Sequence, residues 1–115
     1  MDAKIEKSEA FALRIIKLYS YLKEQGEFVM SKQILRCGTS IGAKIAESIF
    51  AESQDDMIHK LSISLKEASE TKYWLNLLYK SEYLDKRLFD SLLDDRIQLI
   101  KILTSIIKKL KQIKK

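Results

Sequence analysis

The sequence contains no proline and only three glycines among its 115 residues, although 46% of the residues are hydrophobic. Proline and glycine are the residues that most often interrupt helices and form turns between strands. A chain with so few of them favours long amphipathic helices over a sheet. The single cysteine, Cys37, excludes an intramolecular disulfide.

Long apolar runs are also missing, because charged residues interrupt every stretch before it reaches the ~18 residues of a membrane span. The N-terminal segment MDAKIEKSEAF lacks the apolar run of a signal peptide. We therefore expect a cytoplasmic protein with no membrane contact. The length predicts a single domain over residues 1–115, and a core of this size is often supplemented by oligomerisation.

Motifs of catalytic and metal sites are absent from the sequence. It has no glycine-rich phosphate loop, nucleophile elbow or Ser/His/Asp set. The only histidine, His59, follows Asp56 by three residues and supplies one half of a pattern that di-iron bundles need twice. We expect His59 to be solvated in the first turn of a helix, and Cys37 to be a small buried residue. The chain is predicted not to be an enzyme and to need no metal or cofactor.

Apolar residues recur with helical spacing over four segments that short connections separate. Short connections place successive helices side by side and antiparallel. The sequence therefore predicts an all-α fold, an antiparallel up-and-down four-helix bundle. The expected helices are 3–25, stopped by Gly26; 31–52, capped by Ser31; 53–80, opened by Ser53 with Asp56 in a capping box; and a last helix capped by Asp85.

The last predicted helix is apolar over an unusually wide arc, with Arg96 as the one polar interruption of its main row. So wide an arc is difficult to bury inside one four-helix bundle, so we expect part of it to face another subunit. The residues predicted to face inward are Phe11, Ile15, Leu18, Leu22, Ile34, Gly38, Ile41, Ile45, Ile49, Ile58, Leu61, Leu65, Ala68, Leu75, Leu78, Tyr79, Leu92, Leu99, Leu103, Ile106, Leu110 and Ile113, with a second row of Leu93, Ile97, Ile100 and Ile107.

Small residues line one side of the second predicted helix. Gly38, Gly42 and Ala46 follow one another at intervals of four. Glycine inside a helix costs ~1 kcal/mol relative to alanine, so two on one face predict the close approach of another helix. The sequence leaves open whether that helix belongs to the same chain or to a partner subunit.

Four charged residues fall near the middle of the second and third predicted helices: Lys44, Glu47, Glu67 and Glu70. If these helices are antiparallel neighbours, Lys44 is expected to lie opposite Glu67 or Glu70 as a partly buried ion pair that fixes register.

The positive charge of the chain gathers at its C-terminal end. The net charge is +5, and residues 85–115 carry nine basic against four acidic side chains, with no acid after Asp95. Lysines on an exposed helical face bind phosphates by releasing counterions. This pattern predicts a nucleic-acid-binding face; the alternative is a tail that only confers solubility. The lysines concerned are Lys101, Lys108, Lys109, Lys111, Lys114 and Lys115.

Three segments together resemble a known bacterial family: EAFALRIIKLYSYL at 9–22, SKQILRCGTSIGAKIAES at 31–48 and ISLKEASETKYWLNLLYKSEYL at 63–84. They are similar to the four-helix bundle family named after the large-ribosomal-RNA intervening-sequence proteins, whose relatives include accessory proteins of diversity-generating retroelements. The most specific stretches are R-x-G-x-S-I-G and E-A-x-E-x-x-x-W-L. Where the family usually has Asn before Ile-x-Glu, this chain has Lys44.

The resemblance implies an antiparallel bundle that assembles into a homopentameric ring without known catalytic activity. It also implies, from the retroelement relatives, a basic surface that binds nucleic acid and a reverse transcriptase. We therefore expect a non-catalytic homo-oligomer that binds RNA or DNA nonspecifically through the C-terminal lysines. The rival expectation is a protein-interaction scaffold, such as a partner-binding accessory subunit, that does not bind nucleic acid.

Overall fold

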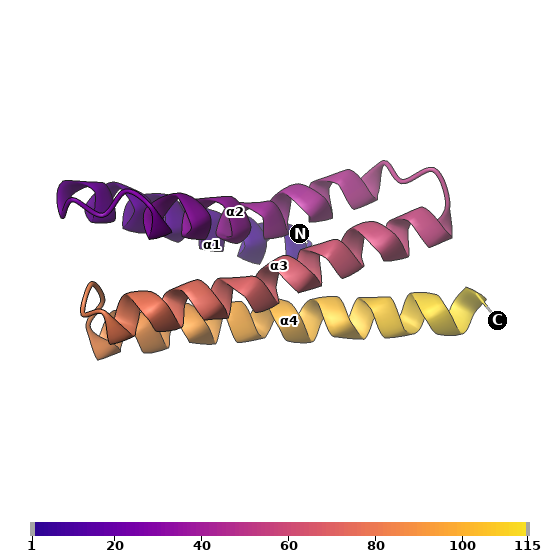
Figure 1. The fold of residues 1–115 in the computed structure, drawn as a ribbon. Coiled ribbons are helices and arrows are strands. Elements are labelled where there is room, and N and C mark those ends of the chain that lie inside the picture. The colour runs from indigo at the N-terminus through magenta and orange to yellow at the C-terminus, as the bar shows by residue number, and fades with distance from the viewer. Residues whose placement is uncertain (1, 115) are drawn as a thin grey trace.

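The computed structural model describes residues 2–114, with side chains as far as Ile113, and these residues form four α-helices. Each helix packs against the next, and α4 returns to contact α1 (Figure 1). The predicted all-α, up-and-down four-helix bundle is confirmed. The helices are α1 (Ala3–Glu24), α2 (Met30–Ile49), α3 (Gln54–Lys80) and α4 (Lys86–Lys114).

Two helix starts use the predicted caps. Ser53 Oγ accepts a hydrogen bond from the Asp56 amide at 3.0 Å, and Asp56 Oδ2 accepts one from the Glu52 amide at 3.1 Å. Asp85 Oδ1 accepts from the Leu88 amide at 2.8 Å. These side chains satisfy amides that have no partner within the first turn of a helix, which explains why α3 and α4 begin where they do.

The start of α2 differs from the prediction. Ser31 is not the N-cap: it is fully buried, and the helix begins one residue earlier at Met30. Glu27 Oε1 instead accepts hydrogen bonds from the amides of Val29 and Ser31, at 3.0 and 2.8 Å. The longer side chain of Glu27, four residues upstream, therefore caps the start of α2 in place of Ser31.

The ends of α1 and α3 have the same hydrogen-bond pattern. After α1, the Glu27 amide donates to Leu22 O at 2.9 Å across Gly26, whose φ is +81°. After α3, the Tyr83 amide donates to Leu78 O at 2.9 Å across Glu82, whose φ is +71°. Both are Schellman ends, but only the first has the glycine that adopts this left-handed conformation without strain.

The core follows the predicted apolar rows except at two helix ends and at Ile97 of the second α4 row, which is 39% exposed. All four predicted residues of α1 are buried, as are Leu92, Leu99 and Leu103 in α4. Ile49 and Ile113 were expected to face inward, but their exposed fractions are 51% and 73%. Both lie at the C-terminal end of a helix, where the apolar periodicity of the sequence continues beyond the region that a neighbouring helix covers.

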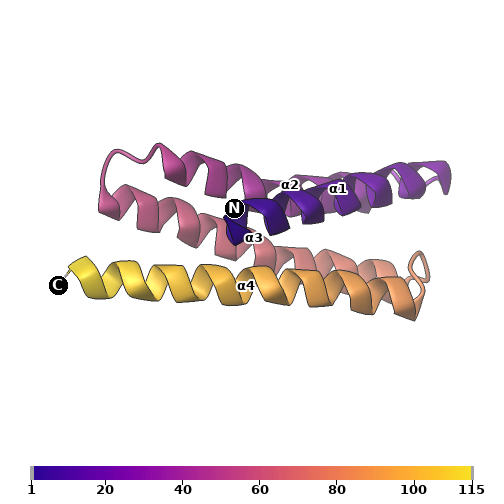
Figure 2. The same cartoon turned by 180° about the vertical axis from the view of Figure 1, so that it is seen from behind.

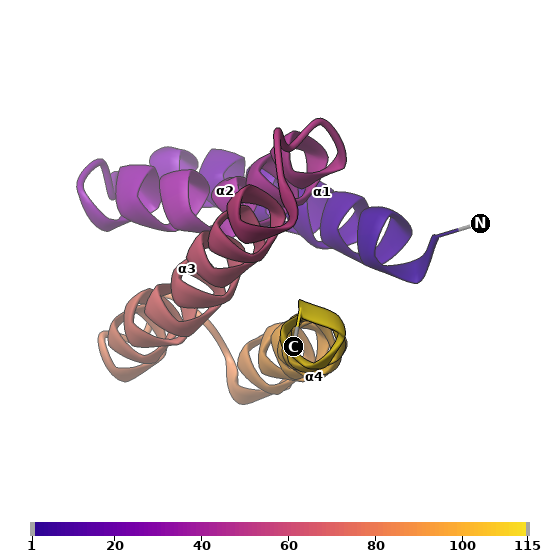
Figure 3. The ribbon, with the colours of Figure 1, turned by 90° about the vertical axis from the view of Figure 1, so that its right-hand side faces the viewer.

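The bundle is elongated, with principal extents of 49 × 24 × 22 Å. The N-terminus lies near the middle of the long axis, and α4 continues well past it (Figures 1 and 2). Viewed along the long axis, α1 and α2 form one layer, and α4 lies on the other side of the molecule (Figure 3). Within residues 2–114, no helix is sufficiently long and apolar to span a membrane.

Candidate functional site

The C-terminal half of α4 presents the predicted cationic face. The side chains of Lys101, Lys108, Lys109 and Lys111 are exposed, and none of the four makes an ion pair with another described residue. Of the two remaining predicted lysines, the side chain of Lys114 and all of Lys115 lie outside the described residues. We call the four described side chains the lysine face.

Burial of the opposite side of α4 fixes the direction of the lysine face. Leu99, Leu103 and Ile107 are buried against the core, so residues about half a turn away point to solvent. Thr104 and Ser105, which lie among the lysines, are exposed as well. The negative end of the helix dipole, in the last turn of α4, stabilises the lysines nearest to it without neutralising their charge.

Cations elsewhere in the chain are more often paired. Arg14 Nη1 lies 2.6 Å from Asp95 Oδ2, and Lys86 Nζ lies 2.6 Å from Asp90 Oδ2. Both acids belong to the first half of α4, whereas every charged residue in its second half is a lysine. No ion pair among the described residues therefore balances the four lysines of this face, and unpaired positive charge attracts polyanions.

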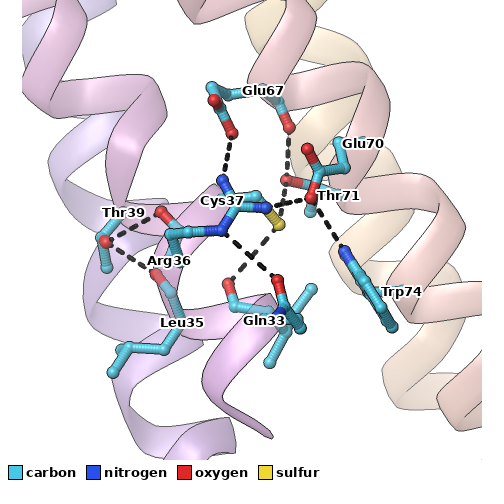
Figure 4. Close-up of polar contacts among 10 residues, drawn as sticks. Gln33, Leu35, Arg36, Cys37, Thr39, Glu67, Glu70, Thr71 and Trp74 are labelled. Atoms are coloured by element: carbon cyan, nitrogen blue, oxygen red, sulfur yellow. Dashed lines mark hydrogen bonds and ion pairs between the residues drawn. The ribbon is translucent and has the colours of Figure 1, made fainter. Parts of the chain in front are cut away.

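A polar cluster joins α2 to α3 on the surface of the bundle (Figure 4). Arg36 donates to Glu67 Oε2 at 3.2 Å and also bonds Glu70 Oε2, which accepts a further hydrogen bond from Trp74 Nε1 at 3.0 Å. Desolvation lowers the pKa of Arg36, but the charges of Glu70 and Glu67 outweigh that effect and raise it overall. The two sequence stretches that carry the family resemblance meet in this cluster.

The predicted partner of Lys44 is wrong. Lys44 Nζ pairs within its own helix, 2.9 Å from Glu47 Oε2, and the Lys60 ammonium approaches the same carboxylate at 3.5 Å. The hydrogen bond from Lys44 lowers the pKa of Glu47. Arg36, two turns earlier on α2, takes the place opposite Glu67 and Glu70 because the antiparallel register brings it there.

Neutral hydrogen bonds reinforce the contact between α2 and α3. Ser64 Oγ donates to the Ile41 carbonyl at 2.8 Å, and Thr71 Oγ1 lies 3.4 Å from the sulfur of Cys37. Cys37 is fully buried, and burial raises the pKa of its thiol. A buried thiol with a raised pKa is a poor nucleophile, so Cys37 serves packing rather than chemistry.

The small residues of α2 face α1 of the same chain, which settles the alternative that the sequence left open. A Cβ placed on Gly38 would lie 2.8 Å from Ile15 Cγ1, and one on Gly42 would lie 3.2 Å from Ser8 Oγ. Ala46, the third member of the row, is exposed and lines a surface groove between the two helices. Close packing therefore explains the two glycines but not Ala46.

Arg96 is a feature that periodicity flagged only as an interruption. It is 6% exposed, and its Nη1 donates to the Ala68 carbonyl of α3 at 3.2 Å. Its Nε has no hydrogen-bond partner among the described residues, and burial lowers the pKa of the guanidinium. A single charged residue in an apolar row gives no indication of whether it turns outward or is buried.

Groups that could bind a metal are not gathered in the described part of the chain. Within residues 2–114, no three His, Cys, Asp or Glu side chains converge on one point. His59 is exposed on α3, and Asp56, the carboxylate three residues before it, is engaged with the Glu52 amide.

These features define a small all-helical protein with one cationic face. The chain belongs to the 23S rRNA-intervening sequence protein family, whose sequence profile it matches over residues 3–105. It is similar to a crystal structure of a protein with unknown function from the S23 ribosomal protein family of Bacteroides thetaiotaomicron, with 53% identity and a TM-score of 0.90 over 92% of this chain and 99% of that one. No curated protein matches.

Proposed function

We propose that this protein is a non-catalytic homo-oligomer that binds RNA or DNA nonspecifically through the lysine face. The observation that carries the proposal is four exposed lysines, without ion-pair partners among the described residues, on one helix end that has no acidic residue. Such a face binds phosphates by counterion release, without reading bases. Assembly of several copies would repeat the face and strengthen binding to a long polyanion.

The chemistry of the face limits what it can recognise. No aromatic residue lies beyond Phe89 in the sequence, so no ring on the same helix lies among the lysines for a base to stack on. Lysine ammonium groups also lack the planar geometry with which arginine recognises guanine. Affinity is therefore expected to depend on charge and salt, and only weakly on sequence.

The test compares two charge-matched variants on a structured RNA hairpin. The first variant replaces the four lysines of the lysine face, Lys101, Lys108, Lys109 and Lys111, with glutamine. The control variant replaces four exposed lysines of α2 and α3 with glutamine: Lys32, Lys66, Lys72 and Lys80. For four contacts, the wild type should lose on the order of 100-fold in affinity between about 50 and 200 mM salt. The first variant should lose most of that salt dependence, and the control should keep it.

Two results would overturn the nucleic-acid proposal. One is no binding by the wild type at low salt; the other is equal binding by the two variants. Either result favours the rival function, a protein-interaction scaffold, for which the exposed apolar side chains of Leu13, Ile16 and Phe50 are the supporting observation.

A further inference from the structure

A shallow groove runs between α1 and α2 on the face of α1 that does not contact α4. Its volume is about 260 Å³. Small side chains form much of its lining, so a larger side chain from outside can enter. The lining includes Ile5, Glu9 and Ala12 of α1 and Gly42, Ala43 and Ala46 of α2.

A second uncovered surface lies on α4. The hydrogen bond between Lys7 and Gln98, at 2.9 Å, is the α1–α4 hydrogen bond nearest the C-terminus among the described residues. Beyond it α4 continues without α1 beside it (Figures 1 and 2). The stripe that continues this side of the helix is Ile102, Ile106, Lys109 and Ile113, which we call the α4 flank.

The α4 flank is apolar and only partly covered. Ile102 and Ile106 are half-buried, and Ile113 is 73% exposed. The stripe is separate from Lys101, Lys108 and Lys111, which point to a different side of the helix by their spacing. Ile106 also packs against the core, so the α4 flank offers the exposed Ile113 and the uncovered parts of Ile102 and Ile106 for contact with another molecule.

Charge decides what the α4 flank can contact. Lys109 lies within the flank, and no acid follows Asp95, so two flanks brought together would place like charges opposite one another. The groove offers the complementary charge, because Glu9 is its one charged lining residue and makes no ion pair with the described residues. Apolar side chains and a single ammonium on one surface thus match small side chains and a single carboxylate on the other.

We infer that the α4 flank of one copy docks in the α1–α2 groove of a second copy, with Lys109 beside Glu9. This inference rests on the homo-oligomer of the proposed function and names its contact surfaces. Because the two surfaces differ, the contact is head-to-tail, and each added copy still presents one free groove and one free flank. In an assembled subunit the lysine face is thus reduced to Lys101, Lys108 and Lys111, which stay outside the contact and available to phosphates.

The experiment uses one variant for each surface. Ala46→Arg fills the groove and places a cation opposite Lys109, while Ile102→Lys with Ile113→Lys makes the flank polar. Both variants add only positive charges, so mixing them creates no new attractive ion pair between the two proteins. Each variant alone should sediment as a monomer at concentrations where the wild type is oligomeric. This corresponds to a rise of at least about tenfold in the dissociation constant of self-association.

Mixing the two variants gives the decisive measurement. The groove variant keeps an intact flank and the flank variant keeps an intact groove, so an equimolar mixture should form a species of two subunits and nothing larger. An interface built from the same patch on both subunits gives no such rescue. Failure of the mixture to associate, or wild-type assembly by either variant alone, overturns the inference.

Matched controls separate loss of the contact from loss of the fold. Ser69→Arg on α3, and Thr104→Lys with Gln112→Lys on α4, add the same charges at exposed positions outside both surfaces and should assemble like the wild type. Circular dichroism checks that each variant is folded, and the milder Ala43→Arg and Ile113→Lys replace any that is not. A monomeric wild type would refute the proposed homo-oligomer as well. RNA binding is judged separately, by a glutamine variant of Lys101, Lys108 and Lys111 that leaves Lys109 in the contact.

Discussion

At the scale of single residues, Arg96 is the side chain whose environment is least favourable. Its guanidinium is buried at the contact between α3 and α4, yet it donates its hydrogen bond to a backbone carbonyl, and no carboxylate pairs with it in the described chain. Removing a charge from water costs several kcal/mol, which a single neutral acceptor does not offset. The lowered pKa of the guanidinium has the same origin.

Arg96→Met is therefore expected to stabilise the protein. Methionine fills similar volume with no charge to desolvate, and we expect the free energy of unfolding to rise by about 1 kcal/mol or more. Urea denaturation of Arg96→Met beside Arg87→Met, a change at an exposed position of the same helix, measures this. A fall of more than about 1 kcal/mol in Arg96→Met alone would show that the buried cation is compensated.

At the scale of helices, the contact between α1 and α2 depends on two glycines with different surroundings. Gly38 faces Ile15, which is fully buried and branched at Cβ, so it has little freedom to move. Gly42 faces Ser8, whose Oγ would lie 3.2 Å from an added methyl group, so a shift of a few tenths of an ångström relieves the contact while Ser8 keeps its hydrogen bond to the Ile5 carbonyl. The same substitution should therefore have opposite effects at the two positions.

Gly38→Ala should lower the free energy of unfolding, because overpacking against Ile15 costs roughly 1–3 kcal/mol and exceeds the gain of ~1 kcal/mol in helix propensity. Gly42→Ala should be neutral or stabilising by up to ~1 kcal/mol, because the propensity gain meets only a mild contact. Thermal unfolding of the two variants and the wild type tests the pair. Equal shifts of the melting temperature would contradict this account of the packing.

At the scale of the whole molecule, the bundle is closed unevenly. α2 and α3 are joined by the Arg36 cluster and by buried hydroxyl groups. α1 and α4 are joined by the Arg14–Asp95 ion pair and the Lys7–Gln98 hydrogen bond, and open surface pockets of about 330, 220 and 130 Å³ lie beside their contact. Partly exposed ion pairs add little stability, so this side of the bundle is the weaker one.

Hydrogen exchange should reveal the difference. The segment of α1 between residues 14 and 21 lines the pocket of about 330 Å³. Its amides should exchange at least about tenfold faster than the amides of α3 between residues 61 and 78. α3 packs between α2 and α4 and opens only with the bundle, whereas α1 can separate from α4 first. Comparable protection of the two segments would show that the bundle opens as one unit.

Much of this architecture could be predicted from the sequence, because it depends on local properties. Helical periodicity and the scarcity of breaking residues set the four helices, and Ser53 and Asp85 set two of their starts through bonds to neighbouring amides. The start of α2 could not be found this way, because several upstream side chains compete for its free amides and Glu27 takes them.

By itself, then, the sequence determined the fold class, the family and the clustering of lysines after Asp95, since each follows from the order of residues along the chain. Only the tertiary structure decided that Arg36 rather than Lys44 meets Glu67 and Glu70, that Gly38 admits Ile15 of the same chain, and that Arg96 is buried. These depend on the register and relative rotation of helices, which arise from packing among distant segments.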